Sequence, residues 1–214
     1  MLESVSRALR LSPAERTHLI LLGRGDDVPP CKAPPERVSP NVRRLVENLG
    51  FGPVYLLGRR WDYLAWNRAF EVVFGWQPDR EPLSRNHIWQ TFMDPTRREL
   101  IPDWNKSARL LVAKFRADSA RNIGDAAFEQ LIAALRSSSP EFRKLWNRHE
   151  VAGGGEGRKE LHHPIVGRLV FDHAVFRHDD HTQQRLIVHT PSCEGDTPAK
   201  LAELLDAEPA ALAR

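Results

Sequence analysis

Strand-forming segments stand on both sides of one long helical stretch in this 214-residue chain, and that placement limits the folds it can adopt. Pro53–Asn67 holds two short runs of β-branched, aromatic and aliphatic side chains around a polar turn, a pattern typical of a β-hairpin. Alternating patterns return at Val166–His173 and Arg185–Thr190, whereas Ile88–His149 has helical periodicity. The pattern predicts an α+β fold in which helices cover one face of an antiparallel sheet.

Helix start and stop signals add detail to this prediction. Asn67 is placed to cap a short helix that Gly75 would end. Asp94-Pro95 and Ser139-Pro140 predict two further helix starts, because proline is favoured at the first helical position. An earlier helix is expected over 41–49, with its apolar residues on one face.

The ends of the chain differ from this main domain. Residues 1–22 predict a stub of two short helices, the second of which begins with a capping box formed by Ser12 and Glu15. Residues 23–40 contain five prolines and predict a linker. We therefore expect a main domain at 41–206 and a short tail at 207–214.

Composition indicates a soluble globular protein. The chain has 31 basic and 28 acidic side chains, and the basic ones form no continuous stripe that would argue for nucleic-acid binding. Its apolar runs are far shorter than the roughly 20 residues of a membrane span. Cys31 and Cys193 lie far apart and read as free thiols in a reducing compartment. A cytoplasmic location, without membrane contact, is expected.

Enzymatic and metal chemistry find little support. Seven of the nine histidines lie between His149 and His189, yet His178 and His181 fall in a predicted turn without a recognised zinc spacing. Gly153–Gly157 follows a helix and precedes a strand, which is the wrong order for a phosphate-binding loop. We expect no catalytic residue, no metal and no cofactor.

Six tryptophans can be interpreted in two ways. Large aromatic side chains usually fill a core. Several of them could instead line a cavity, since ligand pockets are mostly apolar with a few placed polar groups. The residues leave both interpretations open.

The segment Pro53–Gly75, with its hairpin, Trp66-Asn67 and short helix, resembles the opening of a PAS domain, a small-molecule sensor fold. More widely, residues 38–205 resemble the ligand-binding domain of MmyB-like bacterial transcription regulators. The blocks that carry this resemblance are Leu57–Arg68, Arg85-Asn86, Phe92–Pro95, Asp103-Trp104, Ser139–Phe142, Leu145–Val151, Lys159 with His163-Pro164, Val166-Gly167 and Leu186–Val188.

The resemblance implies a PAS-like sensor that follows an Xre-type helix-turn-helix, with a fatty acid such as myristate as one known type of ligand. Residues 1–22 are similar to the tail of that DNA-binding domain through Arg7–Arg16 and His18-Leu19. The recognition helix of the family would lie upstream of Met1. The family pattern therefore implies DNA as a partner only where an intact helix-turn-helix is supplied, and it implies a homodimer.

A fatty-acid ligand needs an apolar tunnel with a cationic or hydrogen-bonding group at its mouth. The candidate carboxylate partners are Arg60 or Arg85, with Asn86 or His149 as neutral donors. Arg85-Asn86 could equally be a helix cap, and His149 a histidine at a helix end. The candidate wall residues are Trp66, Trp89, Phe92, Leu111 and Trp146.

These expectations lead to one main hypothesis and one alternative. The chain would be the ligand-sensing domain of a bacterial helix-turn-helix transcription regulator, binding a small hydrophobic molecule to control DNA binding. Alternatively, it would be a dimerisation or interaction module that senses nothing and modulates an intact regulator.

Overall fold

A computed structural model describes residues 5–6, 8–9, 11–12, 15–16, 19, 23, 36–76, 82–152, 156–177 and 183–207. The chain divides into two compact units, one from 36–104 and 155–214, the other from 105–154 and residues of 1–35. Some of the expected features lie outside the described residues: Cys31, residues 153–155 of the expected turn at 153–157, the expected turn at 178–182, most of the linker at 23–40 and most of the tail. The expected domain boundaries stay a prediction.

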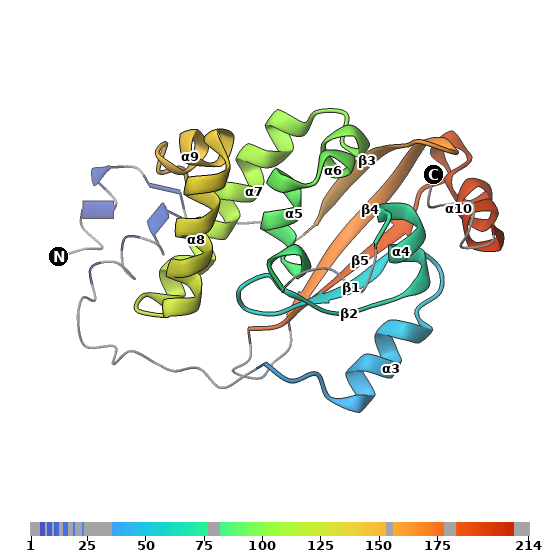
Figure 1. Cartoon of the computed structure of the whole chain (residues 1–214), viewed down its shortest axis with the longest axis horizontal. Coiled ribbons are helices and arrows are strands. Elements are labelled where there is room, and N and C mark those ends of the chain that lie inside the picture. Colours follow the sequence, from blue (N-terminus) through green and yellow to red (C-terminus); the bar gives the residue numbers. More distant parts are fainter. Residues whose placement is uncertain are drawn as a thin grey trace. The chain divides into compact units, whose positions relative to one another are not determined.

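The first unit is built on a five-stranded antiparallel sheet, which confirms the predicted α+β fold (Figure 1). The strands lie in the order β2-β1-β5-β4-β3, so the hairpin pairs with the last strand of the sheet. Their bounds are β1 Val54–Leu57, β2 Tyr63–Trp66, β3 Gly157–His163, β4 Gly167–Arg177 and β5 Arg185–Pro191. The strands on either side of the helical stretch thus form one sheet.

Helices begin where the sequence predicts most of them. Asn67, Asp94, Asp125 and Ser139 each accept a hydrogen bond from a backbone N–H of the following helix. The final helix, which begins at Thr197, is not among the elements predicted from the sequence. The helices are α3 Pro40–Asn48, α4 Arg68–Phe74, α5 His87–Met93, α6 Pro95–Leu100, α7 Trp104–Ser119, α8 Ala126–Ser138, α9 Pro140–Trp146 and α10 Thr197–Asp206, with 3-10 turns at η1 Pro82–Arg85, η2 Ala120–Asn122 and η3 Glu194–Asp196.

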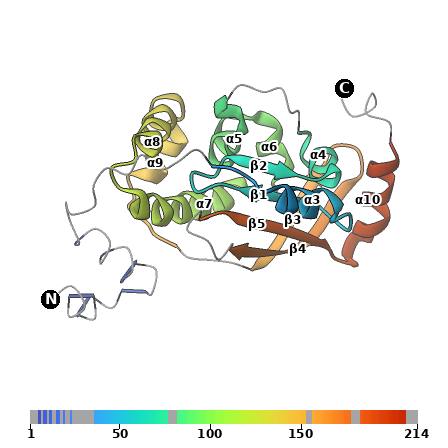
Figure 2. The same cartoon turned by 90° about the horizontal axis from the view of Figure 1, so that it is seen from below.

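The sheet has two differently covered faces. Helix α3 packs on what we call the outer face, where Val46 meets an apolar cluster that includes Val54, Leu56 and Val188 (Figure 2). Successive strand residues point to opposite faces. We call the other side the inner face, and its side chains include Tyr55, Lys159, Phe171, His173, Ile187 and His189.

Two adjacent histidines of β3 point to opposite faces of the sheet, because strand side chains alternate. The sequence predicts that His162 and His163 point to opposite faces. In the structure His162 is exposed, whereas His163 is buried and its Nε2 lies 3.2 Å from the carbonyl oxygen of Val72. Burial lowers the pKa of His163.

The buried side chain of Asn67 joins three elements of this unit. Its Oδ1 accepts hydrogen bonds from the backbone N–H groups of Val54 and Phe70, each at 3.0 Å. Its Nδ2 donates to the carbonyl oxygens of Gly52, at 2.7 Å, and Leu49. One amide therefore ties the end of α3 to the start of β1 and the start of α4.

The second unit is helical. Its core includes the rings of Phe115 on α7 and Phe128 on α8, with centroids 5.9 Å apart. On α9, Trp146 stacks on Phe142, and the guanidinium of Arg116 lies 3.9 Å from the Trp146 ring and donates to the Trp146 carbonyl oxygen. A cation at this place also satisfies a carbonyl at the end of a helix.

Part of the predicted N-terminal stub is described. The backbone N–H of Ser12 donates to the Glu15 carboxylate at 2.8 Å, and the Glu15 N–H donates to Ser12 Oγ at 3.3 Å. The predicted capping box is confirmed, and these bonds lower the pKa of Glu15.

Asn67→Ala should lower the free energy of unfolding by about 2–4 kcal/mol, because it removes a helix cap and leaves several backbone groups of a buried region without partners. The measurement is urea unfolding followed by circular dichroism. Asn48→Ala is the matched control, since exposed Asn48 donates only to a carbonyl of its own helix, and its effect should stay below about 0.5 kcal/mol. Equal effects of the two substitutions would contradict the role assigned to Asn67.

Candidate ligand-binding site

Aromatic and imidazole rings from three strands meet on the inner face of the sheet. His173 on β4 lies opposite His189 on β5, and their rings stack with centroids 5.8 Å apart. His189 also stacks on Tyr55 of β1 at 5.6 Å and meets the edge of Phe171 at 6.0 Å. This continuous ring surface forms one side of the candidate site.

Helices α4 and α5 supply the facing rings. Phe70 and Phe74 of α4 lie 4.9 Å and 6.4 Å from Tyr55, measured between ring centroids. From α5, the Nδ1 of His87 lies 2.5 Å from the hydroxyl oxygen of Tyr63, a hydrogen-bond distance. Burial raises the pKa of Tyr63 to about 12, so its hydroxyl stays protonated at neutral pH.

A buried cation completes the cluster. Arg97 of α6 is only 6% exposed, and its guanidinium carbon lies 4.5 Å from the Phe74 ring centroid and 5.7 Å from that of Phe70. Its Nη2 donates to Oε1 of Gln90 at 2.9 Å, and its Nε has no hydrogen-bond partner within the described ranges. Buried charges in proteins are usually paired with an opposite charge. Here the hydrogen-bonding partner is a neutral amide.

The two histidines at the centre are uncharged at neutral pH. Burial, together with the positive charges of Lys159 and Arg97, holds the pKa of His87 and that of His189 well below the usual range. His189 is 1% exposed, and among the residues described here its Nδ1 meets no hydrogen-bond partner. The inner face therefore combines neutral donors or acceptors with buried positive charge.

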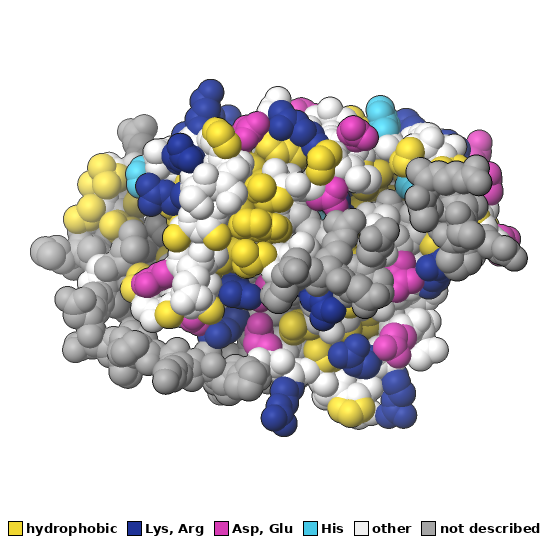
Figure 3. Space-filling model, in the orientation of Figure 1, with side chains coloured by type: hydrophobic (Ala, Val, Ile, Leu, Met, Phe, Trp, Pro, Cys, Tyr) yellow, Lys and Arg dark blue, Asp and Glu magenta, His cyan; other side chains and the backbone are white. Residues whose placement is uncertain are grey.

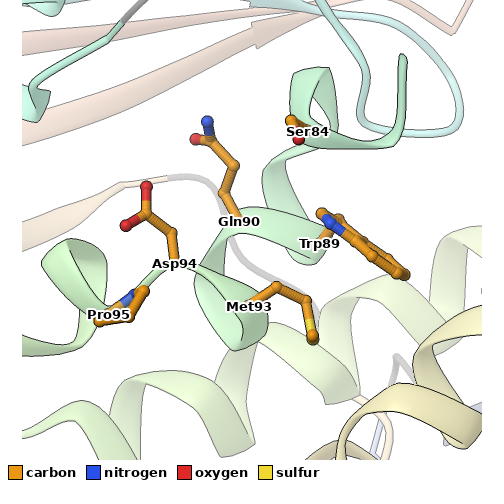
Figure 4. A pocket seen from close by; sticks show the side chains of 6 residues that line it. All are labelled: Ser84, Trp89, Gln90, Met93, Asp94 and Pro95. Carbon is orange, nitrogen blue, oxygen red and sulfur yellow. The ribbon is translucent and has the colours of Figure 1, made fainter. Parts of the chain in front are cut away.

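A surface hollow lies beside this cluster (Figure 4). It has a volume of about 220 Å³ and is lined by Ser84, Trp89, Gln90, Met93, Asp94 and Pro95. Gln90 and Asp94 extend to the same side of the α5–α6 joint, and Met93 extends to another. Because Gln90 also binds Arg97, the wall of the hollow touches the buried cation.

Asn86 and Arg60, two of the residues expected at the ligand, are engaged in local structure. Asn86 is fully buried, caps α5 through Oδ1, and donates to the carbonyl oxygen of Arg60 and to Oδ1 of Asp62. Arg60 pairs with Asp62 at 2.8 Å. The helix-cap interpretation, which the sequence left open for Asn86, describes its contacts in this structure.

The expected wall residues of the first unit do not line one common cavity among the described residues. Trp89 lines the hollow, whereas Phe92 packs against Trp104 with ring centroids 5.4 Å apart. Trp66 packs on Trp76 at 5.0 Å, beside the ring cluster. Arg85, the other expected carboxylate partner, is exposed at the end of η1.

The remaining three expected residues belong to the helical unit. Leu111 is half-buried on α7, Trp146 packs within α9, and His149 is exposed with a positive φ of 55°. The structure therefore gathers Trp66 and Trp89 near the first unit's cluster and places these three in the other unit. As ligand contacts, all nine residues stay a prediction.

Sequence reasoning missed the polar members of the inner face. Arg97, Gln90, Lys159, His87 and His189 were not among the expected site residues. For the two strand residues a signal was present, since period-two alternation puts Lys159 and His189 on the face that carries Phe171. For Arg97 and Gln90 no such local signal exists, because their roles depend on the packing of α5 and α6 against the sheet.

The described part of the chain offers neither a metal-binding group nor a membrane-spanning helix. No group of three or more His, Cys, Asp or Glu side chains there is arranged to hold a metal ion. None of the described helices combines the length and apolar character needed to span a bilayer.

The described residues thus place rings, imidazoles and a buried cation between an antiparallel five-stranded sheet and helices α4, α5 and α6. The chain belongs to the MmyB-like transcription regulator ligand binding domain family, whose model matches residues 38–205. A comparison with curated proteins finds no match. The family defines the chain as a ligand-binding domain of a regulator and points away from an enzyme.

The lowered pKa values of His87 and His189 make the free energy of unfolding depend on pH. Because the folded state holds their pKa below the unfolded value of about 6.5, their contribution to stability is complete above pH 6.5 and is lost as the pH falls below it, by about 1.4 kcal/mol per pH unit for each histidine. His189→Phe should remove one such contribution and flatten the slope between pH 6 and pH 5, as measured by urea unfolding at each pH. Exposed Asn48→Ala, which removes no titratable group, is the control and should keep the original slope. An unchanged slope in His189→Phe would show that His189 accepts a proton in the folded protein.

Proposed function

We propose that this domain senses a small hydrophobic molecule, such as a fatty acid, and that binding of this molecule controls DNA contact by a helix-turn-helix regulator. The inner face carries the proposal, since it offers buried rings for an apolar body and buried polar groups for one end of a ligand. Family membership supports a ligand-binding role. The ligand and its action on DNA are the proposed part.

In this proposal the sensor acts through a helix-turn-helix related to the stub at 1–22, as a homodimer in the cytoplasm. In the view of Figure 3, Lys and Arg side chains are scattered among Asp and Glu side chains over the visible face. A DNA-binding surface needs a basic stripe or patch. We therefore assign DNA contact to the helix-turn-helix and not to the sensor face in this view.

The proposal predicts that the purified chain binds dodecanoate with one-to-one stoichiometry, observed by native mass spectrometry. A ligand at 100 times its Kd adds about 2.7 kcal/mol to the free energy of unfolding, which is a readily measured rise in Tm. Trp89→Ala, at the hollow, should weaken binding about tenfold. Phe176→Ala is the matched control, because Phe176 is 56% exposed and lies outside both the hollow and the inner-face cluster.

The alternative is an interaction module that senses nothing. It predicts that neither a copurified molecule nor added acyl chains are retained, and that the chain instead forms mixed dimers with an intact regulator. The two hypotheses are distinguished by the affinity of that regulator for labelled operator DNA, measured by fluorescence anisotropy. Under our proposal dodecanoate changes DNA affinity, whereas under the alternative only the added chain does.

A further inference from the structure

We propose that Arg97 binds the anionic end of the ligand, and that Gln90 holds this position until the ligand replaces it. This inference rests on the proposed sensing function and names the ligand class: a monoanionic amphiphile that carries a carboxylate on an apolar body. Two residues are thereby assigned roles in ligand specificity.

The first support is the incomplete bonding of a buried charge. A guanidinium carries five N–H donors in a planar fork that matches a carboxylate. In the described part of the chain, Arg97 uses one nitrogen on the neutral Gln90 amide, rests on the Phe70 and Phe74 rings, and leaves Nε without a partner. A carboxylate would supply both the missing acceptor and the missing negative charge.

The second support is the charge of the surroundings. The Lys159 Nζ lies 5.6 Å from the centroid of the same Phe74 ring that Arg97 contacts. Both cations lie close enough to lower the pKa of His87 and His189, so the region carries positive potential beside neutral imidazoles. A single anion bound at Arg97 would be stabilised by both cations.

The carboxylate of Asp94 sets a limit on the ligand. It caps α6 through Oδ1, which accepts a hydrogen bond from the Thr96 N–H at 3.0 Å, and it also lines the hollow. A second negative charge on the ligand would be repelled there. For this reason the inference is confined to monoanions.

The third support is that Gln90 lies between Arg97 and the hollow. Its side chain is 3% exposed and bonded to Arg97, yet it forms part of the wall of the hollow (Figure 4). Rotation about its side-chain bonds would move the amide from Arg97 without moving α5. Trp89, Met93 and Pro95 on the same wall would contact the apolar body next to the head group.

A comparison with the other unit sharpens this assignment. Arg116 is also buried, also rests on an aromatic ring and also has an Nε without a hydrogen-bond partner among the described residues, while it donates to the carbonyl oxygen of Trp146 near the end of α9. Incomplete bonding is therefore common to the two arginines, and what distinguishes Arg97 is that its partner Gln90 lines the hollow. Arg116→Gln is therefore a matched control for Arg97→Gln.

The test compares two probes of equal chain length on the full chain, dodecanoate and its uncharged methyl ester, with Kd measured by calorimetry. Arg97→Gln should weaken dodecanoate binding at least about tenfold, while ester binding stays within about twofold. Arg116→Gln should leave both values unchanged. Arg97→Lys should recover only part of the dodecanoate affinity, because an ammonium lacks the planar fork.

A second variant keeps the test independent of the stability of the Arg97 substitutions. Gln90→Glu introduces an internal carboxylate at Arg97, so it should weaken dodecanoate binding about tenfold and leave the ester unaffected. Asp94→Asn keeps a helix-capping side chain but removes a negative charge, and it should leave dodecanoate binding equal or stronger.

The outcomes separate this inference from the proposed function. If both probes bind but neither Arg97→Gln nor Gln90→Glu distinguishes them, the anion role of Arg97 is overturned and the sensing function stands. If the unmodified chain binds neither probe, acyl-chain sensing fails and the inference fails with it.

Discussion

The pairing register of β1, β5, β4 and β3 decides which side chains can meet beneath helices α4, α5 and α6. A shift of one residue in any strand would turn its inner-face side chains to the outer face. Gly157, opposite His173, shows how closely the register is fitted: a Cβ there would lie 2.9 Å from Cε1 of the His173 ring. The ring cluster and its cations therefore depend on the sheet being paired as it is.

Within that arrangement, Arg97 differs from the arginines of the surface. Arg158 and Arg168 are exposed and pair with the carboxylates of Glu194 and Glu160. Such exposed pairs contribute little to stability. Arg97, by contrast, carries its charge into the interior against rings and one amide. A buried charge that stays without an opposite charge costs several kcal/mol, and a ligand that brings that charge can recover part of it. In our proposal, the buried charge of Arg97 lowers the stability of the ligand-free domain and makes the domain selective for ligands with one negative charge.

Much of the fold could be predicted from local signals, and much of the candidate site could not. Asn67, Asp94 and Ser139 are residue types that favour helix starts, and each caps a helix in the structure. The alternation of strand side chains correctly predicts that His162 and His163 point to opposite faces of the sheet. The sequence alone does not distinguish a polar residue that binds a ligand from one that caps a helix. Asn86 is an example, because it is a candidate ligand contact by sequence and the N-cap of α5 in the structure. Arg97 stands in a short, charged helix, and only the packing of α6 reveals that it is buried. Burial of a charge is a property of tertiary structure, which one helix does not encode.

If Arg97 binds the ligand as we propose, the head group of a bound fatty acid stays ionised at the inner face. Carbon-13 NMR of dodecanoate labelled at the carboxyl carbon and bound to the full chain, recorded from pH 8 to pH 4, tests this expectation. A cation at hydrogen-bond distance lowers a carboxyl pKa. We predict a bound signal distinct from that of free dodecanoate, which keeps the chemical shift of an ionised carboxylate well below the pH at which the free acid titrates. A bound signal that titrates at higher pH than the free acid would overturn the role of Arg97, because it would place the head group in an apolar site without a cation.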